Sequence, residues 1–597
     1  MKNLGSINKY FIKYKWRLLL GVVVVIISRF FAVQSGSVVK DIIDSVQKQV
    51  AAFHDPANAA NGAAIKDSIA SSVFEGGMIL LGLALLSGFF MFLSRQTLIV
   101  MSRLIEYDQK NEIYNHYQQL NTQFYKSHFT GDLMNRISED VSRVRMYTGP
   151  SVMYFTSMLG IVVICVWKMV NVNVALTLGV LAPLPLLALT IYIVNKIIFK
   201  KSGKIQAQLS ALTTTAQESY SGVRVIKSFV QENNMFRYFK DNSELYKDSS
   251  INLSLTEALY FPSMNFFVGI SMICTVLIGG YFAIHGRITI GNIAEFVIYI
   301  NLLMFPISSI GMVASMTQRA GASQKRIDEF LHTAPDIITP ANATTQKLQG
   351  AVAFNNISFT YPHTGITALK NFSLSVGAGK KVAVIGKTGS GKSTLAHMLL
   401  RMYDTSHGEV LLDGMDIKKF NLHELRRQIS YAPQEAYLFS DTIYNNIKFG
   451  KDDASEAEVR EAARMADLDK DISTFANGYE TMIGERGVML SGGQKQRMVL
   501  ARAILKNSKL LLLDECLSAV DTQTEKTILA NLTTYLKDKT TFVITHRIFT
   551  SWTFDIIIVL DNGTIVEQGT HEELMQLNGS YAKLYRHQTE TSTVESA

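Results

Sequence analysis

The chain has 597 residues, about four times the ~150 residues of a typical domain, so we expect more than one domain. Hydrophobic residues make up 48% and charged residues only 18%, which excludes a disordered chain or a coiled coil. The mean hydropathy of +0.14 argues against a fully soluble enzyme. Cys165, Cys274 and Cys516 lie far apart, which excludes a disulfide framework and a clustered zinc site.

Apolar stretches long enough to cross a bilayer, which takes about 20 residues, occur only in the first half of the chain. Arg29 and Glu295 are the charges well inside these stretches. Lys168, beside Asn171 and Asn173, predicts a tight turn between two of them. The economical interpretation is six spans, near residues 18–39, 76–95, 146–167, 169–195, 258–284 and 288–313.

The net charge of +8 follows the expected spans and so indicates membrane orientation, not a nucleic-acid partner. Five basic residues precede the first span, seven lie in segment 95–147 and nine in segment 196–256, whereas the opposite side carries few. By the positive-inside rule we expect the N-terminus, both connectors and the whole second half to be cytoplasmic. The protein is then a multi-pass protein of the cytoplasmic (inner) membrane.

The two cytoplasmic connectors, 95–149 and 196–261, contain no proline and show apolar residues at helical spacing. Each is too long for a simple turn, so we predict pairs of membrane helices that continue into the cytoplasm and meet at short tips. The candidate tips are 124–131 and 218–224. The alternative is two small cytoplasmic domains.

A membrane domain over 1–325 is followed by a linker over 326–349 and a second domain over 350–597, where short apolar strands alternate with helices. The strand at 381–385 runs into Gly386-Lys-Thr-Gly-Ser-Gly-Lys392-Ser393-Thr394, a complete P-loop followed by a helical stretch. Its glycines allow backbone N–H groups to surround phosphates. Lys392 would reach the β and γ phosphates and Ser393 would hold Mg²⁺.

A buried strand at 510–513 ends in Asp514-Glu515, as a P-loop ATPase requires. Asp514 would bind Mg²⁺, and Glu515 would orient or deprotonate the attacking water. Together with the P-loop, this pair indicates ATP and Mg²⁺ as cofactors.

Leu490-Ser491-Gly492-Gly493-Gln494 resembles the signature sequence of the ABC transporters. The resemblance covers essentially the whole chain and implies an exporter-type half-transporter. Its fold would be a six-helix membrane domain with long cytoplasmic extensions, followed by an α/β P-loop nucleotide-binding domain. The segment 484–487 also resembles the exporter motif that precedes the signature.

The resemblance also implies roles for individual residues. Tyr361 is similar to the aromatic residue that stacks on adenine, Gln434 to the glutamine that senses Mg²⁺, and His546 to the histidine that contacts the γ-phosphate. The catalytic residues would be Glu515, His546, Gln434 and Lys392. The residues that bind Mg²⁺ would be Ser393, Gln434 and Asp514. The nucleotide-binding residues would be Tyr361, Gly386, Lys387, Thr388, Gly389, Ser390, Gly391, Lys392, Ser393, Thr394, Ser491, Gly492, Gly493 and Gln494.

In this family two nucleotide domains pair head to tail, with ATP between the P-loop of one and the signature of the other. One chain carries one such domain, so the resemblance implies a dimer. Because Glu515, His546 and the signature are intact, both sites of a homodimer would be competent. An intact half with a different partner is the alternative.

The resemblance implies ATP-driven alternating access from the cytoplasmic side or inner leaflet toward the outside. An apolar membrane domain with few fixed charges favours a hydrophobic or amphipathic substrate, a lipid or a drug. A peptide exporter and an ATP-gated channel or mechanical signaller are the alternatives.

Arg29 is a candidate contact for an anionic headgroup, unless it pairs with a carboxylate or extends to the interface, and Glu295 is expected at the interface. Cys516 is expected to be a small buried apolar residue or a redox switch.

Overall fold

The computed structural model describes residues 2–55, 62–484, 490–549 and 552–595, and it forms two compact units. One unit comprises Met1–Tyr117 and Gly131–Thr333, and the other comprises Gln118–Thr130 and Ala334–Ala597. The short segment 118–130 therefore belongs by its contacts to the second unit, although the chain on both sides of it belongs to the first.

The described residues of the first unit form helices only, and six of its helical segments are long and apolar enough to cross a membrane. Each contains one of the apolar stretches found in the sequence, so the expected number of spans is confirmed. The six segments are Lys15–His54, Gly62–Gln119, Thr130–Val172, Val174–Ser221, Glu232–Ile284 and Ile290–Leu331.

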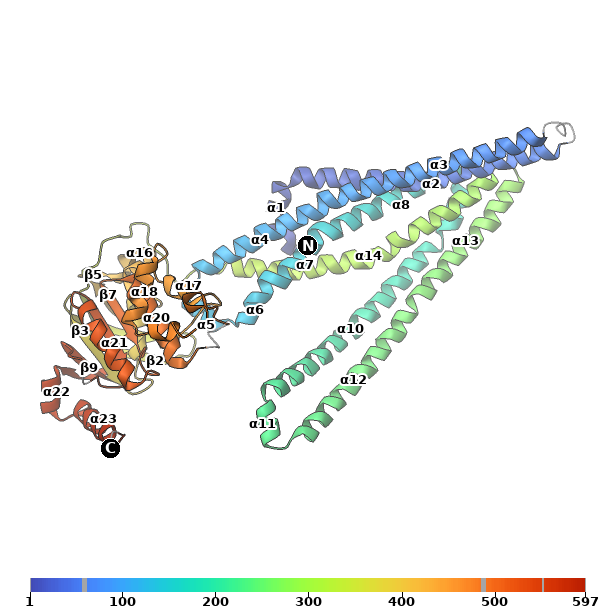
Figure 1. Cartoon of the computed structure of the whole chain (residues 1–597). Helices are drawn as coiled ribbons and strands as arrows, with labels where there is room; N and C mark the ends of the chain where they lie inside the picture. The colour runs from blue at the N-terminus through green and yellow to red at the C-terminus, as the bar shows by residue number, and fades with distance from the viewer. Residues whose placement is uncertain (1, 56–61, 485–489, 550–551, 596–597) are drawn as a thin grey trace. The chain divides into compact units, whose positions relative to one another are not determined.

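The helices around these spans follow one another with few loops (Figure 1). Their bounds are η1 (Lys2–Ile7), α1 (Asn8–Lys13), α2 (Lys15–His54), α3 (Gly62–Ser94), η3 (Arg95–Ile99), α4 (Val100–Gln119), α6 (Thr130–Asn135), η4 (Arg136–Asp140), α7 (Val141–Met146), η5 (Tyr147–Ser151), α8 (Val152–Val172), α9 (Val174–Leu181), α10 (Leu184–Ser221), α11 (Val223–Ser228), α12 (Glu232–Ala258), α13 (Tyr260–Ile284) and α14 (Ile290–Leu331).

Most of the described segment between the first two spans is helical. α2 continues to His54, because residues 40–54 contain no glycine or proline, and α3 resumes at Gly62. The extension is tied down by Asp44, whose carboxylate accepts hydrogen bonds from the Thr289 hydroxyl (2.7 Å) and the Gly291 N–H (3.0 Å). This carboxylate thus satisfies free donors at the N-terminus of α14.

The expected turn at Lys168 is wrong by about one helical turn. α8 continues to Val172, and the side chain of Asn173 accepts a hydrogen bond from the Leu176 N–H (3.0 Å) at the start of α9. Lys168 stays inside α8 because its ammonium group donates to Gln34 (2.8 Å) and Ser37 (3.2 Å) of α2. The lysine is therefore held by side chains distant in sequence, and the asparagine marks the turn.

Both connectors are helical hairpins, as predicted, and not small separate domains. In Figure 1, α10 and α12 run side by side and meet at the short helix α11. The tip lies at 222–231, slightly beyond the expected 218–224, because α10 remains helical to Ser221 and Gly222 follows as its C-cap. The first connector turns at α5 (Thr122–Ser127), capped by the side chain of Asn121.

The second unit contains two sheets. An antiparallel sheet has the order β2-β1-β4-β5, and a six-stranded sheet has the order β10-β9-β3-β8-β7-β6. In the larger sheet the strands from β9 to β6 are parallel, and β10 pairs antiparallel at its edge. The strands are β1 (Val352–Thr360), β2 (Thr367–Val376), β3 (Lys381–Gly386), β4 (His407–Leu412), β5 (Met415–Asp416), β6 (Ile429–Ala432), β7 (Leu510–Asp514), β8 (Thr540–Thr545), β9 (Ile556–Asp561) and β10 (Thr564–Gly569).

Helices cover the parallel sheet, whose central strands are buried throughout, as parallel strands require. The helices of this unit are α15 (Lys392–Leu399), η6 (Ile417–Lys419), α16 (Leu422–Arg427), α17 (Ile443–Lys448), α18 (Glu456–Met465), α19 (Asp469–Ile472), η7 (Gly478–Glu480), α20 (Gly492–Lys506), α21 (Thr522–Tyr535), α22 (His571–Leu577) and α23 (Ser580–Glu595).

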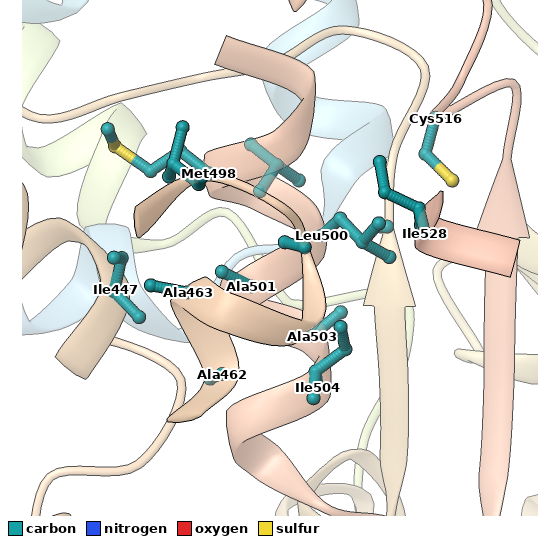
Figure 2. Close-up of a cluster of buried hydrophobic side chains, with 14 of the residues drawn as sticks. Ile447, Ala462, Ala463, Met498, Leu500, Ala501, Ala503, Ile504, Cys516 and Ile528 are labelled. Atoms are coloured by element: carbon teal, nitrogen blue, oxygen red, sulfur yellow. The ribbon is translucent and has the colours of Figure 1, made fainter. Parts of the chain in front are cut away.

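Cys516 lies in the hydrophobic cluster between α20, α21 and β7, which is drawn in Figure 2. Burial raises the pKa of its thiol to about 12, so the reactive thiolate is scarce near neutral pH. The structure therefore supports the interpretation of Cys516 as a small apolar residue over that of a redox switch.

Truncating the central strand should destabilise the second unit. Leu512 in β7 is 0% exposed, whereas Leu577 in α22 is 64% exposed. Leu512→Ala leaves a cavity, which costs about 2–5 kcal/mol, and Leu577→Ala does not. Thermal unfolding of the full chain in detergent should show a lower midpoint for L512A only, and equal midpoints for the two variants would contradict the assignment of β7 to the core.

Candidate functional site

The carboxyl ends of β3, β8, β7 and β6 meet at one edge of the larger sheet. The residues predicted from the sequence follow these ends: the P-loop after β3, His546 after β8, Asp514 and Glu515 at the end of β7, and Gln434 after β6. Open parallel sheets bind ligands at this edge. The topology thus gathers side chains that are up to 160 positions apart in sequence.

The P-loop has a backbone that depends on glycine. Gly389 and Gly391 have φ values of +82° and +100°, which side-chain-bearing residues rarely adopt. A Cβ at Gly391 would also stand 2.2 Å from the carbonyl oxygen of Ala368. α15 begins directly after Gly391, so its free N–H groups and positive dipole end face the loop.

Lys392 lies inside this loop with 6% of its surface exposed. Its ammonium group donates to the carbonyl oxygens of Gly386 and Lys387, both at 2.9 Å, which places the charge within the curve of the loop. Burial lowers the pKa of Lys392. The buried hydroxyl of Ser390 has no hydrogen-bond partner in the described structure. A buried cation and an unpaired hydroxyl within a ring of glycines fit a polyphosphate.

Two predicted metal ligands are already in contact. The Ser393 hydroxyl donates to Asp514 at 3.0 Å, and Tyr431 donates to the other carboxylate oxygen at 3.4 Å. Asp514 is 1% exposed, and burial raises its pKa to about 6. An incoming cation would favour the ionised carboxylate, and hydroxyl and carboxylate oxygens are ligands that suit Mg²⁺.

Glu515 is held by two of the other predicted catalytic residues, Gln434 and His546. Its carboxylate accepts a hydrogen bond from the Gln434 amide at 3.0 Å, and its second oxygen lies 3.4 Å from Nδ1 of His546. The residue has φ of +45°, a strained conformation for a side-chain-bearing residue, and its N–H donates to Ile544 of β8 at 2.9 Å. In this conformation the carboxylate faces Gln434 and His546, which follow β6 and β8.

Tyr361 follows β1 and lies against the helix that begins after the P-loop. Its hydroxyl shares hydrogen bonds with Thr394 (3.0 Å) and His397 (3.3 Å) of α15. The ring is half-buried, and burial raises the pKa of its phenol. The aromatic residue is therefore positioned beside the loop, as a base-stacking role would require.

The signature residues form the N-terminus of α20. Ser491 accepts a hydrogen bond from the Gln494 N–H (3.2 Å), and the Gln494 side chain accepts one from the Ser491 N–H (3.0 Å), which completes a capping box. Ser491 and Gly492 are exposed. No hydrogen bond joins Ser491–Gln494 to the P-loop in the described part of the chain, and the preceding residues 485–489, with most of the 484–487 motif, lie outside it.

Sequence analysis missed Gln496, which connects the signature helix to the catalytic strand end. Its amide donates to the Glu515 carbonyl (3.3 Å) and the Ser518 hydroxyl (2.8 Å), and it accepts from the Ala519 N–H (2.9 Å). The available signal was its position four residues after Gly492 and three before Val499, on the buried face of α20. Tyr431, which lies on β6 three residues before Gln434, was also missed.

The expectation that Glu295 reaches the membrane interface is wrong. Glu295 is 2% exposed and accepts hydrogen bonds from Tyr299 (2.7 Å), Ser37 (2.9 Å) and Asn292 (3.2 Å). Lys168 donates to the same Ser37. The carboxylate thus belongs to a polar network that joins α2, α8 and α14, because a buried charge needs several donors.

A single methyl group at Gly391 should disable the P-loop. Gly391→Ala places its Cβ against Ala368 and forces a positive φ, so we expect at least tenfold weaker binding of a fluorescent ATP analogue. Gly379→Ala is the matched control, since Gly379 has φ of +77° but no atom within 4 Å of its Cβ position. Equal affinities for the two variants would show that the loop tolerates the contact.

Both halves of the chain match models of known protein families. Residues 18–307 match the family model of the ABC transporter transmembrane region, and residues 369–518 match that of the ABC transporter. The chain is 35% identical over 488 residues to the probable multidrug resistance ABC transporter ATP-binding/permease protein YheI of Bacillus subtilis, covering 82% of this chain and 83% of that protein. It is 35% identical over 511 residues to the ATP-dependent lipid A-core flippase of Pseudomonas fluorescens, covering 85% of this chain and 84% of that protein.

A solved structure of a bacterial Atm1-family ABC exporter with ATP bound superposes with a TM-score of 0.75 at 25% identity, over 97% of this chain and 98% of that one. The fold expected from the sequence is therefore confirmed, and its single ATPase domain implies a dimer. The chain belongs to the ABC transporters: it is an exporter-type half-transporter, a multi-pass membrane protein whose ATP-binding domain couples ATP hydrolysis to export.

Proposed function

We propose that this half-transporter acts as a homodimer that moves a hydrophobic or amphipathic molecule, a lipid or a drug-like compound, out across the cytoplasmic membrane. The observation that carries the substrate class is the apolar character of the six spans, in which Arg29, Lys168 and Glu295 are the only charged side chains well inside. Two relatives support the same class, since one is named for multidrug resistance and another for lipid A-core flipping.

In the ATPase site, Glu515 is the group that would orient the attacking water and take its proton. Gln434 and His546 hold this carboxylate from both sides, and His546 would contact the γ-phosphate. Lys392 and the N–H groups of the P-loop would hold the β and γ phosphates. Ser393, Asp514 and Gln434 would hold Mg²⁺, which neutralises negative charge on the phosphates.

The homodimer proposal rests on the exposed N-terminus of α20. A helix N-terminus with a serine and two glycines is suited to binding an anion. In the described chain, the hydrogen bonds of this terminus go to residues of its own helix and to Asp471. A second copy of the chain would place this terminus on the phosphates held by Lys392. Every residue of both composite sites is present in one sequence, so no different partner is needed.

The two connector tips would carry motion between the domains. α5 belongs by its contacts to the ATPase unit, whereas α11 has no buried residue in the described chain. The residues around α11 expose large apolar side chains, with Phe229 71% and Val230 79% exposed. An apolar tip that is bare in one subunit is consistent with a contact made by the other. The basic residues of both connectors support a cytoplasmic location for the two tips.

Substituting the catalytic carboxylate tests the proposed function. Glu515→Gln removes the base and keeps the side chain's size, so hydrolysis should fall by at least about a hundredfold while ATP binding persists. In proteoliposomes, ATP-dependent movement of labelled lipids and hydrophobic dyes should be lost. Glu461→Gln, on the exposed face of α18, is the control and should behave as wild type. Hydrolysis by wild-type protein without movement of lipid or dye would favour peptide export or a channel-like role.

Differently tagged subunits test the composite site. When Lys392→Ala and Ser491→Arg lie in the same subunit and the other is wild type, each site has one lesion and hydrolysis should be lost. When the two changes lie in opposite subunits, one site has both lesions and the other is intact, so hydrolysis should persist. The reverse ranking would mean that each chain uses its own Lys392 and Ser491, and failure to co-purify tagged copies would contradict the homodimer.

A further inference from the structure

The charged side chains inside the spans fall into two groups. Lys168 and Glu295 take part in the polar network that also contains Ser37. Arg29 has no hydrogen bond and no ion pair with any described residue, and its buried Nε lacks a partner. A cation without a counter-charge is costly in the membrane and marks a functional position.

Arg29 is partly exposed and lies far from both ends of its apolar stretch. With a helical rise of about 1.5 Å per residue, Arg29 lies about 18 Å from Arg17, near the start of α2, and about 16 Å from Lys40. The hydrocarbon core is about 30 Å thick, so both interfaces are more distant than an arginine side chain can span. If Arg17 and Lys40 mark the two interfaces, extension of the Arg29 side chain to either of them, one of the explanations open from the sequence, is disfavoured.

Arg29 also lies on the packed face of α2. Val25, Val33 and Gly36, at spacings of four and seven residues from Arg29, are all buried. Ile26 and Phe30, on the adjacent face, are 43% and 41% exposed. Across from Arg29, α8 presents the buried Gly160, whose Cβ position lies 3.7 Å from Cβ of Arg29. The glycine leaves room for the arginine stem between α2 and α8.

The chain cannot supply the missing negative charge from its own spans. Glu295 is the only Asp or Glu within residues 18–39, 76–95, 146–195, 258–284 and 288–313. Both of its carboxylate oxygens already accept hydrogen bonds, from Tyr299 and Ser37 on one and from Asn292 on the other. A second identical copy adds only another Glu295, so within the spans a bound anionic molecule is the remaining source of a counter-charge.

We propose that Arg29 binds the anionic group of the transported molecule, which makes the preferred substrate an amphiphile with a phosphate, carboxylate or sulfonate headgroup. This inference rests on the proposed function and narrows its substrate class. The apolar spans receive the hydrophobic part, and the guanidinium group supplies the only unpaired charge at mid-membrane among the described residues. Arg29 would act as a specificity residue and would contact neither ATP nor the catalytic residues.

The test measures ATP-dependent movement of two fluorescent lipids, phosphatidylglycerol and phosphatidylcholine, across the membrane of proteoliposomes. The two lipids carry the same acyl chains and differ only in their headgroups. Wild-type protein should move the anionic lipid faster. Arg29→Leu should slow the anionic lipid about tenfold or more and leave the zwitterionic lipid unchanged, since a charge-assisted hydrogen bond to the anionic headgroup is lost. Arg29→Lys should retain most of the preference, and Arg17→Leu, at the cytoplasmic end of α2, is the matched control.

A loss of movement for both lipids in Arg29→Leu would indicate a structural role and overturn the inference. Each variant is therefore also assayed in host vesicles of phosphatidylcholine alone and of phosphatidylcholine mixed with phosphatidylglycerol. A preference that follows the host lipid and not the labelled lipid would assign Arg29 to a resident lipid, which also overturns it. An unchanged preference in Arg29→Leu would defeat this inference alone, whereas wild-type protein that moves neither lipid nor dye would defeat the proposed function as well.

Discussion

The parallel pairing of β3, β8, β7 and β6 is the constraint on which the ATPase site depends. Because these strands point the same way, the segments that follow them arrive at one edge of the sheet. Glu515 is the clearest consequence: its N–H bonds to β8, and its carboxylate is held by residues after β6 and β8. Gln496 extends the same arrangement to α20, because its side chain bonds to the backbone carbonyl of Glu515 and the backbone N–H of Ala519.

A second constraint acts in the membrane, where every charge needs a partner. Lys168 and Glu295 meet it through Ser37 and nearby polar side chains, which fasten α2, α8 and α14 together. Arg29, on the same helix as Ser37, finds no such partner among the residues that the structure describes. The contrast separates two charges that stabilise the helix packing from one that we propose binds the substrate.

The sequence predicted what is encoded locally. The P-loop, Asp514-Glu515 and the signature are contiguous motifs, and the structure gives them the expected strand, loop and helix surroundings. It also has the expected six spans, since span length and hydropathy are local properties. The errors concern residues whose surroundings are made by side chains that lie far away in the sequence. Lys168 was placed in a turn because its partners lie on α2, and Glu295 was placed at the interface because Ser37 is 258 positions away. Gln496 was overlooked because its contacts depend on how α20 packs against the end of β7.

The central claim is that ATP hydrolysis drives an amphipathic molecule across the membrane against its gradient. The most direct measurement follows a hydrophobic dye in sealed proteoliposomes whose ATPase domains face outward, with the dye first equilibrated on both sides. The account predicts that added ATP drives the dye into the vesicles above its external concentration, and that this accumulation collapses when ATP is exhausted. Dye that only equilibrates faster, without accumulating, would contradict the account and indicate an ATP-gated pathway.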